Sequence, residues 1–440
     1  MGKMANRHVV VVGAGIAGLS AALRLRQAGA EVTVFESSDR VGGRTSSETH
    51  DGYLYERGTQ FFTSTYRNAL GLIKEMGLQA ELRSTSPWIS VFNDGRPHRM
   101  PSGMLFGVYA LTSGLLSVRD LARFTWHTTS SRWPALDNYS AWAAYDDQDA
   151  ASWSAPRLGR GAEFLLEPVL AGGLMQRIEE TSRACALAVL AVTANGRSEE
   201  LTLARGNDSL PRAMAARVDV KLEAPVQAVE AAPDGGVTVR LSGETVHADA
   251  VVLATTASVA AGIYRAGDKI ERELMATPYG SVIKVGLATK RDWSHDPGLR
   301  NVWAMMIPRG ARREIVSVTM ESAKDPERVI RGGEMLNLFL TAENAERMMD
   351  WPDEQVVSAV AADVERLFPG AFAAKQFTRV VRWREGMPKS PVGRARALAE
   401  YRRTRPRDGR VWLAGDYMGM PLLESAIETG TWAAGRIVEG

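Results

Sequence analysis

The chain has 440 residues, more than one small domain needs, so two or three domains are expected. Hydrophobic residues make up 45% and charged residues 24%, the balance of a soluble globular protein with a large buried core. The 53 Lys and Arg nearly cancel the 51 Asp and Glu, with no long run of one sign, so the charge does not favour a nucleic-acid or acidic partner.

The cysteine, the N-terminal segment and the histidines indicate the cellular compartment and whether a metal is bound. Cys185 is the only cysteine, which excludes an internal disulfide framework and fits a reducing cytoplasm. The N-terminus enters a glycine motif so early that signal cleavage would destroy it, so no targeting segment is expected. The six histidines show no metal-ligand spacing, and no metal site is expected.

The longest uncharged stretch runs over residues 101–118 and includes Met104, Leu105 and Val108. Glycines interrupt it, and it falls short of the roughly 20 apolar residues that a membrane-spanning helix requires. We expect a buried helix of a substrate-binding domain here. Shallow contact with a membrane surface is the alternative.

The first 36 residues predict a βαβ unit. A β-branched run over 8–12 is typical of a strand buried on both faces, and a second strand is expected over 31–35. Between them lie Gly13-Ala14-Gly15-Ile16-Ala17-Gly18 and a helical pattern. Gly13 permits a tight turn, Gly15 permits close approach of a pyrophosphate, and Gly18 permits helix–strand packing, while the helix N-terminus presents free N–H groups. Glu36, at the end of the second strand, can accept hydrogen bonds from ribose hydroxyls. This unit predicts dinucleotide binding.

The rest of the chain is expected to contain both helices and strands. Helices are expected over 69–76, 118–126, 161–175, 353–367 and 423–434, and strands over 218–222, 226–231, 237–241, 247–254, 283–288, 315–320, 335–340 and 411–414. Cofactor signals lie at the start, the middle and the end of the chain. We therefore expect a discontinuous cofactor domain with substrate-domain segments inserted between its parts.

Glu36 to Arg44, with the pair Gly42-Gly43, resembles the extended fingerprint of the FAD-dependent amine oxidase and protoporphyrinogen oxidase superfamily. Further matches are Gly58-Thr59-Gln60, the segment 221–226, Gly280 to Lys284, and the C-terminal stretch from Leu413 through Gly430. The resemblance implies an α/β fold with a discontinuous Rossmann-type FAD-binding domain and a mixed α+β substrate-binding domain, the two-domain architecture of monoamine oxidase. It places the FAD-binding domain at 1–82, 200–279 and 385–440, and the substrate-binding domain at 83–199 and 280–384.

The resemblance also implies roles for individual residues. Arg44 would lie against the cofactor, Val226 would bond the adenine, Asp416 would meet the ribityl and phosphate region, and Lys284 would hold a water beside flavin N5. The implied cofactor-binding residues are Gly13, Gly15, Ala17, Gly18, Glu36, Ser37, Gly42, Gly43, Arg44, Gly58, Thr59, Gln60, Val226, Gly415, Asp416 and Leu423. Covalent members of the superfamily carry a cysteine before the last strand, and this chain has none there, so the FAD is expected to be non-covalent.

The substrate is less well defined. The position of the tyrosine in the amine oxidase aromatic cage falls at Leu422, and Trp383 or Tyr417 could supply a ring instead. The stretch 383–388 is more similar to the protoporphyrinogen oxidase branch. We expect hydride transfer from a small organic substrate, with an amine-type C–N bond favoured and with oxygen or another electron acceptor. The alternatives are a desaturase of the protoporphyrinogen or carotenoid type and a flavin-binding partner protein without catalysis. A homodimer is left open.

Overall fold

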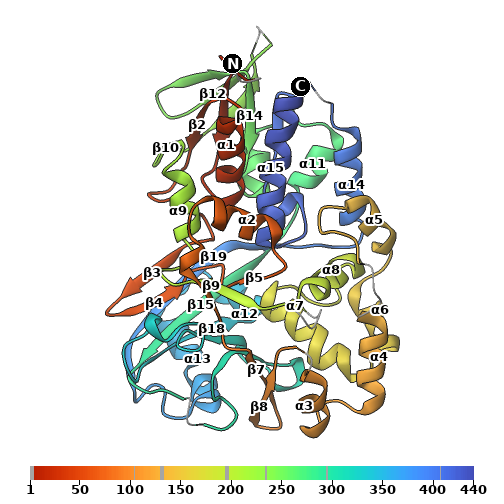
Figure 1. Ribbon diagram of the computed structural model, residues 1–440, viewed down its shortest axis with the longest axis vertical. Helices are drawn as coiled ribbons and strands as arrows, with labels where there is room; N and C mark the ends of the chain where they lie inside the picture. Colours follow the sequence, from red (N-terminus) through yellow and green to blue (C-terminus); the bar gives the residue numbers. More distant parts are fainter. Residues whose placement is uncertain are drawn as a thin grey trace.

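The computed structural model describes residues 4–103, 105–128, 133–193, 198–232, 235–293, 296–406 and 408–440. Figure 1 shows a parallel sheet with α1 and α15 in the upper half of the molecule, a second sheet in the lower half, and a column of helices beside it. The expected fold class, an α/β flavoprotein architecture with a Rossmann-type domain and a mixed second domain, is confirmed.

The upper sheet has five parallel strands from three distant parts of the chain. Its order is β10 (Asp219–Lys221), β2 (Glu31–Phe35), β1 (His8–Val12), β14 (Ala250–Leu253) and β20 (Val411–Leu413). Because the strands are parallel, their carboxyl ends share one edge, which is where ligands bind in such sheets. The loops that follow β1, β2, β14 and β20 all leave from that edge.

Helices α1 (Ile16–Gln27) and α15 (Leu423–Glu439) pack against each other over this sheet. They approach closely because Gly430 has no side chain; an added Cβ would overlap the carbonyl of Ala17. The remaining helices of this half are α2 (Arg67–Glu75), α9 (Ser209–Ala215), α10 (Ala257–Ile263), α11 (Lys269–Met275) and α14 (Arg394–Thr404).

A single strand over 247–254 is wrong. The chain forms β13 (Thr245–Ala248) in an antiparallel meander with β11 (Ala228–Ala231) and β12 (Val237–Arg240), and then β14 in the parallel sheet. The break falls at Asp249, whose carboxylate accepts a hydrogen bond from the His8 amide at 2.8 Å. The Asp249 amide also donates to the His8 carbonyl at 2.8 Å, so this residue pairs with the start of β1 between the two ladders.

The lower sheet has seven strands that are mostly antiparallel. Its order is β19 (Lys375–Pro388), β15 (Tyr279–Thr289), β18 (Glu334–Leu340), β17 (Ile315–Met320), β16 (Val302–Met306), β7 (Trp88–Asn93) and β8 (Arg96–Pro101). Helices α12 (Ala342–Met348) and α13 (Asp353–Leu367) belong to the same half. Smaller pieces join the halves: the hairpin β3 (Ser47–His50) and β4 (Tyr53–Glu56), and the sheet β5 (Phe62–Thr63), β9 (Glu200–Leu203) and β6 (Leu82–Ser84).

The helical column contains α4 (Val118–Thr128), α5 (Tyr139–Trp142), α6 (Ala150–Leu158), α7 (Glu167–Gly173) and α8 (Arg183–Thr193). The helix expected over 161–175 forms without a break, as a π-helical turn, Ala162–Leu166, that runs directly into α7. No helix in the described part of the chain is both long enough and apolar enough to cross a membrane.

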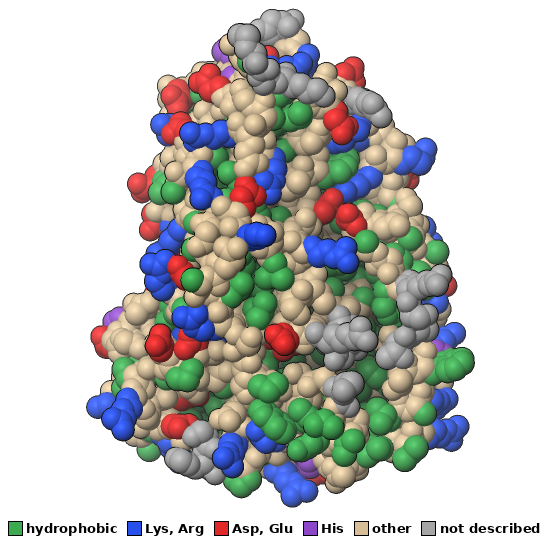
Figure 2. Space-filling view, viewed as in Figure 1, with side chains coloured by type: hydrophobic (Ala, Val, Ile, Leu, Met, Phe, Trp, Pro, Cys, Tyr) green, Lys and Arg blue, Asp and Glu red, His purple; other side chains and the backbone are tan. Residues whose placement is uncertain are grey.

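The expected buried helix over 101–118 is wrong. Only α3 (Phe106–Thr112) forms there, and Ala110 is its one buried residue. Gly103 and Gly114, both at positive φ, flank this helix, and Leu105, Val108 and Tyr109 are exposed. Figure 2 shows hydrophobic side chains gathered on the lower part of this face, in the region of α3. Met104 lies outside the described residues.

Candidate functional site

The glycine loop lies at the carboxyl end of β1. Gly13 has φ +102°, and a Cβ there would lie 2.7 Å from the Ala254 carbonyl oxygen, so only glycine fits this turn. At Gly18 an added Cβ would overlap the Gly13 carbonyl. Gly15 differs, because its Cβ would have no neighbour within 4 Å. Gly13 and Gly18 therefore shape the loop, while Gly15 keeps one side of it open.

Helix α1 begins directly after this loop, with Gly15 as its N-cap and without a side-chain cap or an acid in its first turn. The N–H groups of a first helical turn have no partner within the helix. Together with the dipole they favour a negatively charged group such as a phosphate. Ala17 lies in this first turn.

The carboxylate of Glu36 organises the end of β2. One of its oxygens accepts from the Ala14 amide at 2.8 Å, and the other accepts from the Ser38 amide at 2.9 Å and, more weakly, from the Ser37 hydroxyl at 3.4 Å. The Ala224 amide donates to the Glu36 carbonyl at 2.8 Å. The segment that carries Val226 therefore lies beside Glu36, although Val226 itself precedes the first residue of β11.

Three remote segments meet around Arg44. Its guanidinium makes two parallel contacts with the Asp416 carboxylate, at 2.9 and 2.8 Å, and donates to the Gly386 carbonyl at 2.8 Å. Paired Arg–carboxylate contacts fix both groups in one plane. The paired glycines come close to the loop, since the Gly42 amide donates to the Ala14 carbonyl at 2.8 Å and a Cβ on Gly43 would lie 3.5 Å from the Gly15 Cα.

The C-terminal motif, which begins after β20, lies at the same carboxyl edge of the parallel sheet. Gly415 has φ +131°, and its amide donates to the Thr429 hydroxyl of α15 at 3.0 Å. Helix α15 begins at Leu423, again without a side-chain cap. The acid in its first turn, Glu424, accepts instead from the amides of Asn68 and Ala69.

The stretch Gly58-Thr59-Gln60 packs under Arg44. The Thr59 amide donates to the Arg44 carbonyl at 3.0 Å, and a Cβ on Gly58 would overlap that same carbonyl. The Gln60 side-chain amide donates to the Gly58 carbonyl at 2.6 Å and accepts from Lys324 at 3.0 Å. Its orientation is set from both ends.

Lys284 lies in the middle of β15 and is fully buried. Its Nζ donates to the Glu56 carbonyl and, at 2.8 Å, to the Asn337 side-chain oxygen, and it lies 4.9 Å from the centre of the Tyr55 ring. Burial lowers the pKa of this ammonium to about 7. The structure thus places Lys284 behind the segment 56–60.

Trp383 and Tyr417 do not lie together. The Trp383 indole donates to the Arg57 carbonyl at 3.0 Å and packs at the edge of an apolar cluster, here called the Met175 cluster, formed by Met175, Val282, Val316 and Phe339. Tyr417 is fully enclosed in a different core, with a hydroxyl that has no hydrogen-bond partner. Leu422 is half-buried. The described residues therefore show no pair of facing rings at these positions.

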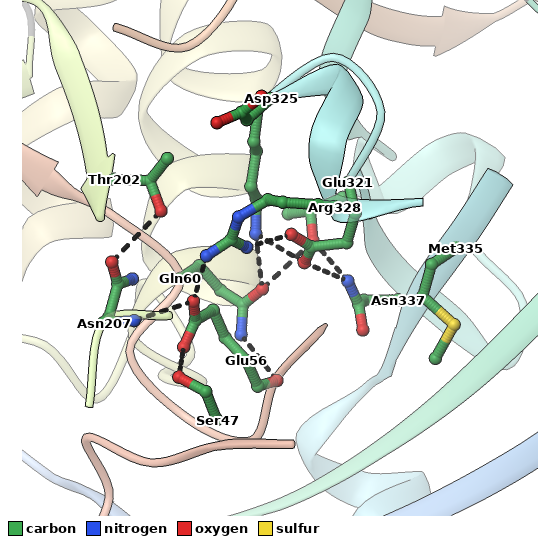
Figure 3. Close-up of polar contacts among 12 residues, drawn as sticks. Ser47, Glu56, Gln60, Thr202, Asn207, Glu321, Asp325, Arg328, Met335 and Asn337 are labelled. Atoms are coloured by element: carbon green, nitrogen blue, oxygen red, sulfur yellow. Dashed lines mark hydrogen bonds and ion pairs between the residues drawn. The ribbon is translucent and has the colours of Figure 1, made fainter. Parts of the chain in front are cut away.

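A buried polar group beside Gln60 was missed by the sequence reasoning. It contains Glu56, Glu321, Lys324, Arg328 and Asn337 (Figure 3). In the sequence, Glu321 to Arg328 contains five charged residues in eight, which is typical of a solvent-exposed loop. The only signal was the strand end at Met320 directly before it.

The donor set fits a dinucleotide. An uncapped helix N-terminus, an open Gly15 and a guanidinium meet at one sheet edge, with Glu36 at the next strand end. Among the described residues, no group of three His, Cys, Asp or Glu could hold a metal ion.

The family model described as flavin containing amine oxidoreductase matches residues 16–438. The chain belongs to this family. It is therefore an oxidoreductase, and family membership implies a flavin cofactor.

Individual relatives differ in how much of the chain they cover. Coproporphyrinogen III oxidase of Bacillus subtilis is 24% identical over 96% of this chain and 94% of its own length. Putrescine oxidase of Kocuria rosea is 30% identical over 52% of this chain and 51% of its own. Among solved structures, wild-type putrescine oxidase bound to putrescine aligns with a TM-score of 0.75 at 21% identity, covering 99% of each chain, and this shows the fold.

Proposed function

We propose that this chain is a non-covalent FAD enzyme that oxidises a porphyrinogen-type substrate, a large ring in which carbon bridges join nitrogen heterocycles. When bound, FAD supplies the hydride acceptor. The observation that carries the substrate class is the Met175 cluster beside Trp383, which is apolar and lacks a facing ring pair.

The roles proposed for the chain's own residues follow from their positions. The first-turn amides of α1 bind the phosphates, Glu36 accepts from the ribose, and Arg44 with Asp416 fixes the loop between them. The uncapped N-terminus of α15 places a positive field at the edge of the sheet, which stabilises negative charge that develops there. The Met175 cluster, whose members are at most 8% exposed, keeps water from the side of Trp383 that packs on it.

An alkylamine substrate fits this site less well. It arrives as an ammonium ion, which proteins recognise with carboxylates or aromatic faces. Leu422 takes the cage position and Tyr417 is enclosed, while the buried carboxylates Glu56 and Glu321 already accept from cationic side chains. Full-length similarity to a coproporphyrinogen III oxidase agrees with this preference, whereas the matched putrescine oxidase segment covers about half of the chain.

Oxidation of an amine-type C–N bond is the second candidate. It is favoured by Lys284, which the resemblance pairs with flavin N5 through a water, and by the putrescine oxidase relative. Two of the three Nζ donors of Lys284 have acceptors, so one is left for such a water. Oxygen or another acceptor would complete the cycle in either case.

Anaerobic mixing of the FAD-loaded protein with coproporphyrinogen III, protoporphyrinogen and putrescine, followed at the visible flavin band, separates the candidates. Bleaching by porphyrinogens alone supports the proposal, and bleaching by putrescine alone supports the second candidate. A yellow protein that none of them bleaches would favour a flavin-binding partner without catalysis. A protein that cannot retain FAD would refute the cofactor assignment.

A further inference from the structure

A buried ion cluster joins the segment 56–60 to the lower sheet. The Glu321 cluster, as we call it, consists of Glu56, Gln60, Lys284, Glu321, Lys324, Arg328 and Asn337. Figure 3 labels five of these seven residues, all except the two lysines. Apart from Gln60, which is half-buried, every member is at most 2% exposed. Buried charges at this density are costly unless each has a partner.

Glu321 is the central acceptor of the cluster. Its Oε1 accepts from Lys324 Nζ at 2.8 Å and from Asn337 Nδ2 at 2.7 Å, and its Oε2 accepts from Arg328. The cations outweigh the cost of burial and hold the pKa of this carboxyl at about 2. Glu321 therefore stays ionised throughout the physiological range.

Two branches lead from Glu321 to the segment 56–60. In the first, Lys324 also donates to the Gln60 side-chain oxygen at 3.0 Å, which leaves the Gln60 amino group directed at the Gly58 carbonyl. In the second, Asn337 accepts from Lys284 at 2.8 Å, and Lys284 in turn donates to the Glu56 carbonyl.

Arg328 forms a third connection between Glu321 and the segment 56–60. It donates to the Glu56 carboxylate as well as to Glu321, and the Glu56 carboxylate also accepts from the Asn207 amide at 3.1 Å and the Ser47 hydroxyl at 2.5 Å. The segment is thus held by its backbone and by the side chains at both of its ends. Within this segment, the resemblance implies that the backbone of Gly58-Thr59-Gln60 approaches the flavin.

The balance of charges makes the protonation of Lys284 depend on the carboxylates of the cluster. Glu56 and Glu321 face Lys324, Arg328 and Lys284, so there is one more cation site than there are carboxylates. The charged groups around Lys284 are Glu56 and Arg57 on the segment side and Glu321 with Lys324 on the sheet side. Because burial already brings the pKa of Lys284 to about 7, removal of a carboxylate would favour its neutral form further.

We propose that Glu321 is a positioning residue of the flavin site, which fixes the segment 56–60 through Lys324 and Gln60 on one branch and through Asn337 and Lys284 on the other. This inference rests on the proposed function, since it takes the flavin to lie against that segment. Glu321 touches neither cofactor nor substrate; it acts through the residues that it holds.

Glu334→Gln provides a matched control. Glu334 is also fully buried, at the start of β18, but it accepts only from Ser322 and the Met335 amide and has no bond to Gln60 or Lys284. A glutamine can keep these contacts, with its oxygen accepting from the two amides and its amino group donating to the Ser322 hydroxyl. In Glu321→Gln, by contrast, the new amino group replaces an oxygen that accepts from Lys324 or from Arg328, so that bond is lost.

The test compares wild type, Glu321→Gln, Lys324→Met and Glu334→Gln, each loaded with FAD. The readouts are the visible spectrum, the flavin midpoint potential by dithionite titration, and the potential against pH from 5.5 to 9, none of which needs the substrate. Glu321→Gln should change the oxidised-to-reduced ratio at fixed potential about tenfold, which for a two-electron couple is about 30 mV. It should also change the pH profile.

Lys324→Met, which breaks the Gln60 branch and leaves the Asn337–Lys284 branch in place, should alter the spectrum and the potential. Glu334→Gln should leave the spectrum and the potential at pH 5.5 as in wild type, because burial raises the pKa of Glu334 to about 7 and its carboxyl is as neutral there as a glutamine. If Glu321→Gln does not fold, Lys324→Met carries the test alone. Variants of Glu321 and Lys324 that match wild type and Glu334→Gln in spectrum and in potential at pH 5.5 overturn the inference. Failure of wild type to bind FAD would refute the proposed function instead.

Discussion

Replacement of Gly15 and Gly18 by alanine should separate cofactor binding from folding. Gly15 has φ −69° and ψ 172°, a conformation that alanine adopts freely, and its Cβ would meet no protein atom within 4 Å. Gly15→Ala should therefore leave the free energy of unfolding unchanged, or raise it by about 0.4–1 kcal/mol through the entropy of the unfolded chain. If a pyrophosphate approaches this backbone, the added methyl should cost about 1–3 kcal/mol of binding, roughly 5- to 150-fold in Kd.

Gly18→Ala should behave in the opposite way. Its Cβ overlaps the Gly13 carbonyl, so the loop and the first turn of α1 must move apart, at a cost of about 1–3 kcal/mol or more in stability. Urea unfolding of the apoprotein and titration with FAD, followed by flavin fluorescence, measure both quantities for each variant. A Gly15→Ala protein that is as stable as wild type and binds FAD with the same Kd would refute the reasoning, because nothing would then lie against Gly15.

Three further predictions concern the rest of the site. Arg44→Lys loses the paired contact with Asp416 and should weaken FAD binding about 10- to 150-fold, as one charge-assisted bond is worth about 1.5–3 kcal/mol; an unchanged Kd in the same titration would contradict this. Lys284→Met should retain FAD but slow flavin reduction or reoxidation, and stopped-flow traces equal to wild type in both half-reactions would exclude the role. Burial raises the pKa of Glu334 from 4.5 to about 7, so the native state holds a proton that the unfolded state has lost; stability should fall by up to about 3 kcal/mol between pH 4.5 and 7. Glu334→Gln should flatten that dependence in urea unfolding, and a slope as steep as in wild type would assign it to another group.

The parallel sheet and the glycine motif were predictable because local pattern alone determines them. The strands His8–Val12, Glu31–Phe35 and Ile315–Met320 have the predicted bounds, since each is a run of mostly β-branched residues. Strand β19 (Lys375–Pro388) was not predicted. It lies at the edge of its sheet and is largely half-buried, so its arginines and glutamate can reach water and mask the strand pattern.

Side-chain exposure and long-range contacts were harder to predict. Residues 101–118 are apolar, yet several point outward, because burial depends on which neighbours the fold brings and not on composition. The Glu321 cluster illustrates the same limit for charges. Its ion pairs join Glu56 to Arg328 across 272 positions, and no local pattern distinguishes such a residue from one in an exposed loop.

The Glu321 cluster also bears on substrate choice. Both of its carboxylates accept from cations, so neither is free to meet a cationic substrate, while Lys284 makes the local field more positive whenever it is protonated. A positive field opposes entry of an alkylammonium but not of a porphyrinogen, whose ring is uncharged and whose side-chain carboxylates are negative. It also favours negative charge that develops on an acceptor beside the segment 56–60. Under the proposed function, this arrangement would assist oxidation of a neutral ring and disfavour an alkylammonium, and Leu422, in place of a cage tyrosine, would not offset that preference. The role that the resemblance gives Lys284 beside flavin N5 is what supports the amine candidate against it.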